Sequence, residues 1–316
     1  MDVVAVTVEV LLVANPISGR RRGPARVREL AETLVRRGHA VELRFTRGRG
    51  DATACAREAD PGLERLVVAG GDGTLNEVLN GLADPAKIPL AQLPLGTANL
   101  LGHEFDLPRA PEACADLVER GRIRRLDLGL LGERRFLAVA SCGFDAMVTA
   151  ALERRSGALG YRGYLAPIWR TLRTYRPPEL RVTLDGGAPI PGALVVASNV
   201  RNYGGLFTVA EHAAPDSGVL DVCIFASATI PDLVRYALAG LRARISRLRG
   251  VTCATARRIE IESAEPVPIE VDGDACGTTP ARIEVVPRCV PFVVPARGAP
   301  PAGPGPQERD EPLPGA

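Results

Sequence analysis

An apolar run that ends in a cluster of glycines constrains this chain more than any other feature. Residues 66–69 (Leu-Val-Val-Ala) are followed by Gly-Gly-Asp-Gly at 70–73, and apolar residues then recur at helical spacing. This order predicts a buried strand, a tight turn and a helix that begins near Thr74. Because glycine tolerates positive φ and has no Cβ, the backbone N–H groups of such a turn can close around a ligand. The positive end of the helix behind the turn favours an anion such as phosphate.

Asp72 lies in the same turn and narrows the choice of ligand. A carboxylate beside phosphate is repelled unless a divalent cation lies between them, so the turn indicates a nucleotide bound with Mg²⁺. Two commoner glycine loops are excluded. A P-loop needs a lysine after its last glycine, and the only lysine is Lys87, while Asn76 replaces the third glycine of a dinucleotide-binding fingerprint. A plain strand-to-helix turn is the simplest alternative, and Thr74 and Glu77 beside Asp72 argue against it.

Strands and helices alternate through the first third of the chain, which predicts an open parallel α/β sheet. The predicted strands are at 3–13, 40–45, 66–69 and 88–93, and the helices between them are at 24–37, 51–59 and 74–82. Ligands bind beyond the carboxyl ends of the strands in such a sheet, so polar residues that follow the strands should converge on one crevice. Those residues are Asn15, Thr46, the central turn, and Gly96 with Thr97.

The pattern changes after Gly121 to short apolar runs separated by turn residues, which predict a largely antiparallel β-sandwich. The runs are at 126–129, 135–140, 179–184, 193–199, 220–225, 258–261, 267–271 and 283–286. Two helices are expected among them, at 161–174 and 230–248. We therefore expect an α/β domain at 1–125, a β-sandwich domain at 126–295, and a disordered tail rich in proline, glycine and acids at 296–316.

The longer string Gly-Gly-Asp-Gly-Thr-Leu-Asn-Glu-Val at 70–78 resembles the nucleotide loop of the diacylglycerol kinase catalytic-domain family, which includes bacterial lipid kinases and sphingosine kinases. Gly-Gly-Asp-Gly alone is shared more widely, with NAD kinases and phosphofructokinases. Further motifs of the family follow in order, namely Asn-Pro-x-Ser-Gly at 15–19, Pro-Leu-Gly-Thr-x-Asn at 94–99, and Val-Asp-Gly with a following acid at 271–274. The resemblance implies an N-terminal domain like that of NAD kinases and phosphofructokinases, with substrate bound between it and a β-sandwich.

The resemblance also implies ATP as the nucleotide, held by four loops of the first domain. Taken singly, Asn15 or Thr46 fits an ordinary turn, but the order and spacing of all the motifs favour a nucleotide site. The positions that match are Asn15, Pro16, Ser18, Gly19, Thr46, Gly70, Gly71, Asp72, Gly73, Thr74, Asn76, Glu77, Gly96 and Thr97.

Two acids are implied as catalytic, Asp72 in the central turn and Asp274. The family uses the last acid of a Val-Asp-Gly-Glu turn to accept the proton of the acceptor hydroxyl, and that position is Asp274 here. Aspartate is shorter than glutamate by one methylene, and a misplacement of about 1 Å can cost on the order of a hundredfold in rate. A purely structural acidic β-turn is the alternative for this segment.

Two departures from the family pattern concern metal. Leu100 stands where relatives carry an aspartate after the last residue of the Gly-Thr motif. The family binds a structural Mg²⁺ in a loop of the second domain, and Ser217 occupies the position of its aspartate, with Asp216 adjacent. The carbonyls of Ala214 and Val219 would complete that site. A weakened or lost metal site is therefore an alternative.

Composition limits the partners of this chain. A formal net charge of +2 gives no general affinity for polyanions, and 4% aromatic residues are too few to stack on single-stranded nucleic acid, so we expect no nucleic acid partner. Seven scattered cysteines, no signal peptide and no apolar run of about 18 residues predict a soluble cytoplasmic protein. Contact with the inner face of the membrane would be peripheral, through the arginines of the predicted helix at 230–248. A homodimer is left open.

The resemblance predicts an ATP- and Mg²⁺-dependent kinase that phosphorylates a hydroxyl of diacylglycerol or a related lipid. The alternative among enzymes is an NAD-kinase-like or other soluble-acceptor kinase, which would share the central turn but not the later motifs. The alternative from another class is a nucleotide-binding protein with degenerate catalysis, suggested by Leu100, Ser217 and Asp274.

Overall fold

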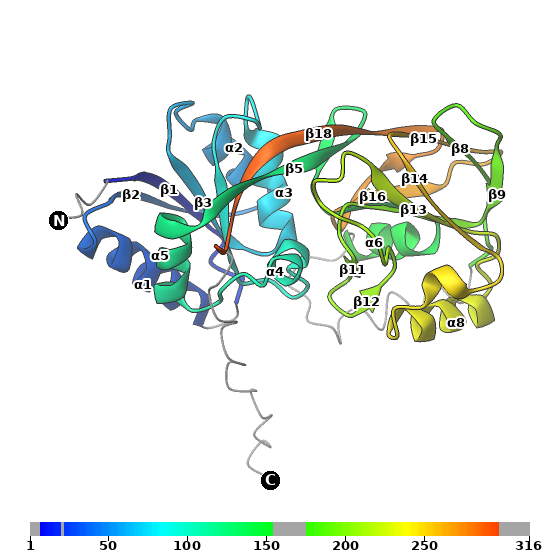
Figure 1. The fold of residues 1–316 in the computed structure, drawn as a ribbon, viewed down its shortest axis with the longest axis horizontal. Helices are drawn as coiled ribbons and strands as arrows, with labels where there is room; N and C mark the ends of the chain where they lie inside the picture. Colours follow the sequence, from blue (N-terminus) through cyan, green and yellow to red (C-terminus); the bar gives the residue numbers. More distant parts are fainter. Residues whose placement is uncertain (1–6, 20–21, 154–174, 297–316) are drawn as a thin grey trace, which may run out of the picture.

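The computed structural model describes residues 7–19, 22–153 and 175–296, which form two lobes (Figure 1). The helix expected at 161–174 and all but the first residue of the expected disordered tail lie outside these residues. Among the described helices, none combines the length and the apolar character needed to cross a membrane.

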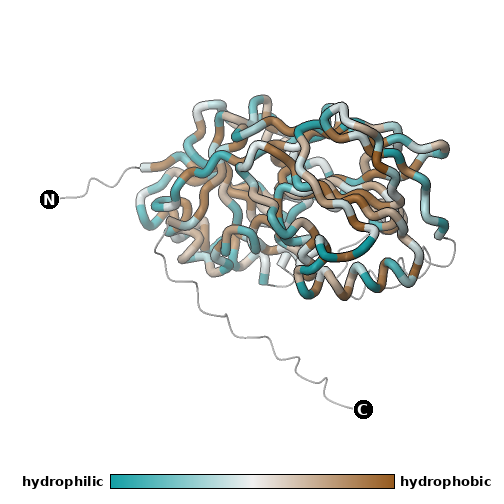
Figure 2. The backbone as a smooth tube through the Cα atoms, turned by 45° about the vertical axis from the view of Figure 1, so that its right-hand side comes forward, coloured by the Kyte–Doolittle hydropathy of each residue, from teal (hydrophilic) through white to brown (hydrophobic). Residues whose placement is uncertain are grey.

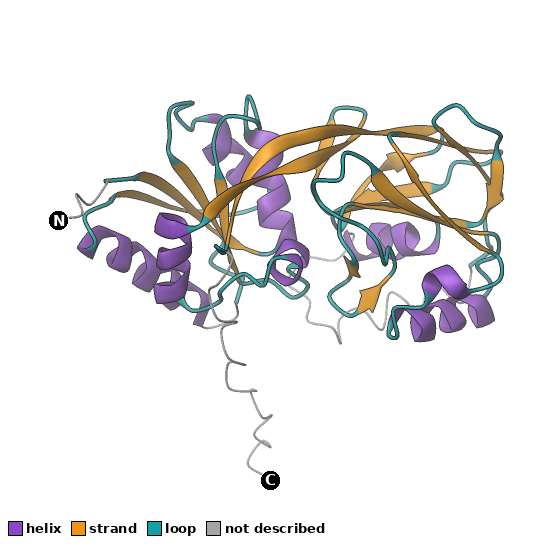
Figure 3. Cartoon of the chain, viewed as in Figure 1, coloured by secondary structure: helices purple, strands orange, loops and turns teal. Residues whose placement is uncertain are grey.

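The first lobe is the predicted parallel α/β sheet, with strand order β2-β1-β3-β4. Its central strands are buried along almost their whole length, as expected when helices cover both faces of a sheet (Figure 3). The strands are β1 (Glu9–Ala14), β2 (Ala40–Phe45), β3 (Arg65–Gly70) and β4 (Leu90–Pro94). The helices are α1 (Gly23–Arg36), α2 (Asp51–Arg57), α3 (Asp72–Gly81), α4 (Leu100–Glu104) and α5 (Pro111–Arg120).

The second lobe is antiparallel, as predicted. A six-stranded sheet of order β14-β13-β10-β7-β16-β17 packs against the far part of the larger sheet, and a second apolar core lies between them. The strands of the six-stranded sheet are β7 (Val139–Cys142), β10 (Leu194–Ser198), β13 (Leu220–Phe225), β14 (Val251–Ala256), β16 (Pro268–Val271) and β17 (Asp274–Thr278). The remaining elements are β6 (Arg134–Phe136), α6 (Phe144–Glu153), β8 (Leu180–Leu184), β9 (Ile190–Gly192), β11 (Asn202–Tyr203), β12 (Phe207–Thr208), α8 (Ile230–Gly240), η2 (Ile245–Arg247) and β15 (Arg258–Ser263).

Two long strands, β5 (Arg122–Leu131) and β18 (Ala281–Val294), cross from one lobe to the other as an antiparallel ribbon (Figure 1). At its far end β18 joins the sheet of the first lobe, where Phe292 pairs in parallel with Leu90 of β4. The last residues of β18 therefore belong to the apolar core of the first lobe, although they follow the second lobe in sequence. The expected domain limits at 125 and 295 stay a prediction.

The prediction of one helix over 230–248 is wrong. α8 ends at Gly240, Ala243 has a φ of 49°, and a separate 3₁₀ turn follows at Ile245–Arg247. Glycine is a poor helix former, and the left-handed backbone at Ala243 turns the chain out of the helical path. The arginines expected on this helix from position 242 onward therefore lie beyond its end.

Candidate functional site

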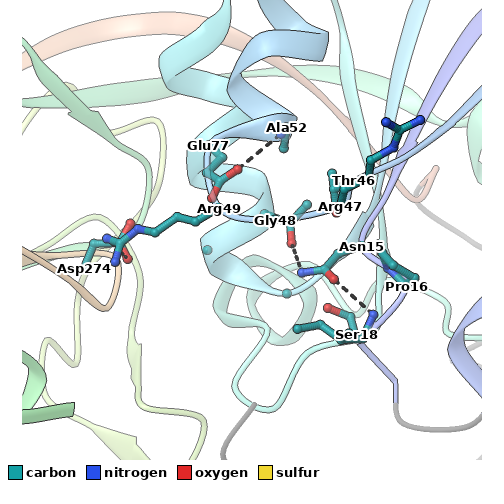
Figure 4. A pocket seen from close by; sticks show the side chains of 14 residues that line it. Asn15, Pro16, Ser18, Thr46, Arg47, Gly48, Arg49, Ala52, Glu77 and Asp274 are labelled. Carbon is teal, nitrogen blue, oxygen red and sulfur yellow. Dashed lines mark hydrogen bonds and ion pairs between the residues drawn. The ribbon is translucent and has the colours of Figure 1, made fainter. Parts of the chain in front are cut away.

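A pocket of about 410 Å³ lies where the loops after β1, β2 and β3 meet the β16–β17 hairpin of the second lobe (Figure 4). Nine residues predicted for the site line it, and five others complete its wall. The nine are Asn15, Pro16, Ser18, Thr46, Gly71, Gly73, Thr74, Glu77 and Asp274, and the five are Ile17, Arg47, Gly48, Arg49 and Ala52. The predicted residues Gly19, Gly70, Asp72, Asn76, Gly96 and Thr97 are outside this lining.

Asn15 ties the first loop to the central turn. Its side-chain amide donates to Thr74 Oγ1 at 3.4 Å, and its Oδ1 accepts the N–H of Ile17 at 3.1 Å. Its backbone N–H donates to the carbonyl of Ala69 at 3.0 Å, so the loop after β1 starts in register with the end of β3. These hydrogen bonds fix the loop after β1 in place as one wall of the pocket.

Two glycines of the central turn, Gly70 and Gly71, are needed for close packing, and no glycine of this turn has a positive φ. A Cβ on Gly71 would lie 3.0 Å from the Cα of Gly96, and a Cβ on Gly70 would lie 2.6 Å from Thr74 Oγ1. A Cβ on Gly73 would meet nothing within 4 Å. The turns after β3 and β4 therefore pack backbone against backbone, while the surface at Gly73 stays clear on the pocket side.

α3 begins at Asp72, immediately after Gly71, two residues earlier than the sequence pattern predicted. The first intrahelical bond runs from the N–H of Leu75 to the carbonyl of Gly71 at 3.1 Å. The N–H groups of the preceding residues have no acceptor within the helix. Since Gly71, Gly73 and Thr74 line the pocket, the positive end of α3 faces it.

Asp72 supports the site from behind the lining. Its Oδ2 accepts the N–H of Asn99 and its Oδ1 accepts the N–H of Leu100, both at 2.7 Å, at the start of α4. Burial is the main cause that raises the pKa of Asp72 to about 6, and the charge of Asp272 adds to it. Leu100 departs from the family pattern in its side chain, but its backbone N–H still bonds to Asp72.

Asn76 joins the two lobes. Its amide donates to Asp272 Oδ2 at 3.0 Å and to the carbonyl of Arg135 at 3.0 Å, and its Oδ1 accepts from Arg134 at 2.5 Å. Only 1% of Asn76 is exposed, so the structure gives this predicted nucleotide residue an interlobe contact.

The turn Asp272-Gly273 carries Asp274 into the pocket. Both turn residues have positive φ, 48° and 86°, which suits a two-residue β-hairpin and explains the Asp-Gly pair. The carboxylate of Asp272 accepts the backbone N–H groups of Leu137, Ala138 and Val139 at 2.9–3.0 Å. The hairpin is therefore pinned to the chain between β6 and β7.

Asp274 begins β17 and bonds to two arginines. Its Oδ2 accepts from Arg134 at 2.7 Å. Its Oδ1 accepts from Arg49 at 3.3 Å, and Figure 4 shows these two side chains side by side. Arg49 comes from the loop after β2, so this ion pair joins the lobes across the pocket. Arg47 and Arg49 were not predicted for the site, although two arginines within Thr-Arg-Gly-Arg-Gly directly after a strand are a signal for it.

A buried acid, Glu270, holds the same hairpin from inside the second lobe. Its Oε2 accepts the N–H of Gly273 at 2.8 Å, and its side chain is near Asp145, which accepts a hydrogen bond from the Tyr203 hydroxyl. Burial, then the charge of Asp145, raises the pKa of Glu270. This group fixes the turn that precedes Asp274.

Comparisons with known proteins agree with this geometry. The family model described as the diacylglycerol kinase catalytic domain matches residues 9–131, and that of the YegS C-terminal NAD kinase beta sandwich-like domain matches residues 138–294. A probable YegS-like lipid kinase of Chromohalobacter salexigens is 30% identical, over 90% of this chain and 93% of its own. The chain belongs to the diacylglycerol kinase catalytic-domain family.

Two further relatives match this chain over a similar share of its length. A diacylglycerol kinase of Bacillus subtilis is 28% identical over 91% of this chain and 97% of its own. A crystal structure of a diacylglycerol kinase from Bacillus anthracis superposes with a TM-score of 0.72 at 26% identity, and the match covers 90% of this chain and 96% of that one. The resemblance inferred from the sequence motifs is confirmed.

The loop expected to hold a structural Mg²⁺ in this diacylglycerol kinase family member is closed by hydrogen bonds. The N–H of Ser217 donates to the carbonyl of Ala214 at 3.1 Å, and its hydroxyl donates to the carbonyl of Val219 at 2.9 Å. The carboxylate of Asp216 accepts two bonds from Arg124, each of 2.6 Å, and Arg124 holds the pKa of Asp216 below its usual range. Within the described residues, no group of three or more His, Cys, Asp or Glu is placed to hold a metal ion. The four expected ligands lie together, but their donor atoms are already bonded.

Proposed function

We propose that this chain transfers the γ-phosphate of ATP to a hydroxyl of diacylglycerol or a closely related lipid. One observation carries the proposal: the N-terminus of α3 and Asp274, which come from different lobes, line one pocket. Phosphoryl transfer needs a nucleotide cradle and a base that faces the acceptor hydroxyl. The named relatives are diacylglycerol kinases and lipid kinases, which supplies the class of acceptor.

The first lobe would bind the nucleotide. The positive end of α3 and the side chains of Arg47 and Arg49 would face the phosphates, in place of the lysine that other phosphate loops use. Mg²⁺ would come with ATP, where it offsets the negative charge of the phosphates. The carboxylate that fits it is Glu77 in the lining, because Mg²⁺ prefers oxygen ligands and needs only one or two from the protein. Asp72 lies behind the lining, with both of its oxygens bonded to backbone N–H groups at the start of α4.

Asp274 would take the proton of the acceptor hydroxyl as that oxygen attacks the γ-phosphorus. Asp272 and Glu270 position it, because they fix the hairpin turn through backbone N–H bonds. The Oδ1 of Asp274 pairs with Arg49, so a nucleotide phosphate that competes for this arginine would free that oxygen for the acceptor, while Oδ2 stays bonded to Arg134. This coupling would join nucleotide binding to activation of the base.

The two alternative functions considered from the sequence are less favoured. A soluble-acceptor kinase of the NAD kinase type is disfavoured by relatives that are named lipid kinases along nine-tenths of the chain. A protein with degenerate catalysis is disfavoured by Asp274, which lines the pocket despite its shorter side chain. We also propose that the enzyme meets its lipid at the inner face of the membrane, as a peripheral protein of the cytoplasm.

The proposal is tested by transfer of labelled γ-phosphate from ATP to a panel of acceptors. The panel contains diacylglycerol, monoacylglycerol, ceramide and sphingosine, with NAD as the soluble acceptor. We expect label in a lipid and none in NAD, and we expect a chelator of Mg²⁺ to abolish transfer. Label in NAD alone, or hydrolysis of ATP without any labelled acceptor, would contradict the proposed function.

A further inference from the structure

Exposed apolar side chains gather on one helix of the second lobe. Of the nine exposed large apolar residues in the described chain, four lie on α8 or directly after it, at intervals of four, four and three. That spacing places them in one row along the helix, and Figure 2 shows apolar and polar positions alternating there. The row consists of Ile230, Val234, Leu238 and Leu241, with exposed fractions of 47%, 56%, 50% and 57%.

The opposite side of α8 is firmly packed, so the row is a fixed surface. Tyr236 is 6% exposed, its ring centroid lies 4.6 Å from that of Phe225, and its hydroxyl donates to the carbonyl of Ser227 at 2.8 Å. Gly240 lies against Phe207 of β12, where an added Cβ would approach to 3.2 Å. The helix therefore presents its apolar row without having to unfold or turn.

The segment that holds the row is strongly basic. Residues 226–250 contain five arginines and one acid, Asp232, a net charge of +4 from 5 − 1. Asp232 pairs with Arg235 at 3.3 Å. The other four arginines are exposed and follow directly after the last apolar residue of the row, at Arg242, Arg244, Arg247 and Arg249. Their charge is complementary to an anionic surface.

The β11–β12 hairpin lies between the row and the buried acid Glu270, which holds the turn before Asp274. β12 packs on α8, and the hairpin tip carries Leu206 with 54% exposure. The hydroxyl of Tyr203 on β11 donates to Asp145 and to Glu270. Next to β11, Arg201 pairs with Glu104 of α4 at 3.0 Å. In Figure 1, α4, β11, β12 and α8 follow one another along one edge of the molecule. A surface that touched α8 would thus lie beside the β11–β12 hairpin, which contacts both lobes through α4 and Glu270.

We propose that α8 and the arginines after it are the surface with which this kinase docks on a bilayer of anionic phospholipid. The apolar row would enter the boundary between headgroups and acyl chains, and the arginines would lie among the phosphates. A second copy of the chain is a poorer occupant, because a twofold contact through this face would oppose one cluster of +4 to another. The inference deepens the proposed function, on which it rests for the idea that the substrate is in a membrane.

The test compares two surfaces of equal exposure. Val234→Glu combined with Leu238→Glu places charge in the row, and the control, Val35→Glu, changes a helical valine of α1 that is also 56% exposed. Sedimentation is measured without ATP or acceptor, on vesicles of phosphatidylcholine with phosphatidylglycerol and on phosphatidylcholine alone. Wild type and control should sediment with the anionic vesicles at low salt and be released by salt. The double variant should bind at least about tenfold more weakly.

Turnover separates the two proposals. On long-chain diacylglycerol in anionic vesicles the double variant should lose about tenfold in rate, while on a short-chain soluble diacylglycerol it should match wild type. A double variant that sediments like wild type overturns the docking surface, as does one whose only change is from dimer to monomer in size-exclusion chromatography. Wild type that binds vesicles but phosphorylates neither acceptor overturns the proposed function and leaves the docking surface standing.

Discussion

At the scale of single residues, carboxylates in similar turns have different tasks. Asp274 lines the pocket and contacts two arginines, whereas Asp72 faces the backbone at the start of α4. The difference follows from burial. Asp72 bonds two N–H groups in a poorly solvated place, and its pKa rises, while the Asp274 side chain remains 24% exposed to the cleft.

The raised pKa of Asp72 predicts how stability depends on pH. Because the folded state binds this proton at a pKa of about 6 and the unfolded state near 3.8, the contribution of Asp72 to stability falls as pH rises between these values. Relative to Asp72→Asn, wild type should lose on the order of 2 kcal/mol between about pH 4 and pH 7. Urea unfolding of both proteins at the two pH values measures this difference. A difference that does not change with pH would show that the pKa is not raised.

The hydrogen bonds of Ser217 predict that removal of metal ions will not change the stability of the protein. The N–H and hydroxyl of Ser217 satisfy the two carbonyls that a metal would otherwise bind, so a chelator should leave the melting temperature unchanged. Ser217→Ala should cost about 1 kcal/mol because the bond to the Val219 carbonyl is lost. Differential scanning fluorimetry with and without a chelator is sufficient. A fall of several degrees that Mg²⁺ reverses would mean that the loop binds metal.

At the scale of elements, the β16–β17 hairpin depends on Asp272. This residue bonds three backbone N–H groups of one lobe and the amide of Asn76 from the other. Asp272→Asn keeps a side chain that tolerates positive φ but removes acceptor capacity, and should lower the free energy of unfolding by about 1–3 kcal/mol.

Asp185→Asn is the matched control for that change. Asp185 has a φ of 50° and also accepts backbone N–H groups, from Arg257 and Arg258, but it is exposed and does not bridge the lobes. Its replacement should cost less than about 1 kcal/mol. Equal losses in urea unfolding would show that the interlobe bonds add nothing to stability.

Sequence patterns predicted the first lobe well because its signals are local. β2 was predicted at its observed limits, since a short apolar strand between turn residues needs no information from elsewhere. By contrast, the run at 283–286 revealed only a part of β18, because the strand continues through Pro287 and a register shift before it joins the other lobe. The role of its final residues depends on pairing with β4, which no local pattern contains.

The site shows the same division. The motifs indicated that Asn15 and Thr46 would lie together, because the ends of strands in a parallel sheet meet on one side. Asp274 reaches the same pocket from the antiparallel second lobe, and only its resemblance to a family motif indicated it. The motifs did not reveal that Asn76 contacts a residue almost two hundred positions away, and its role in nucleotide binding stays a prediction. Motif spacing contains information only about residues that are near each other in sequence. The interlobe bonds of Asn76, and the position of Asp72 behind the pocket lining, depend on the tertiary structure and cannot be predicted from such spacing.

At the scale of the whole molecule, the ribbon of β5 and β18 should make the two lobes unfold together. Phe292 is fully buried in the first lobe, and Phe292→Ala should cost about 3–5 kcal/mol. The control is Val286→Ala on the same strand, 38% exposed, with a cost below about 1 kcal/mol. Scanning calorimetry should show one transition shifted as a whole. Two transitions, of which only one moves, would show that the lobes are independent.

We propose above all that phosphate moves from ATP to a lipid hydroxyl in the pocket between the lobes, with Asp274 as the base. The most direct test of this proposal is the rate of label transfer from ATP to diacylglycerol by Asp274→Asn, with Asp274→Glu as the conservative variant and bound nucleotide measured in parallel. We predict that the asparagine variant binds ATP and loses about 10²–10⁴-fold in rate, and that the glutamate variant stays active. An asparagine variant with the wild-type rate would show that Asp274 is not the base.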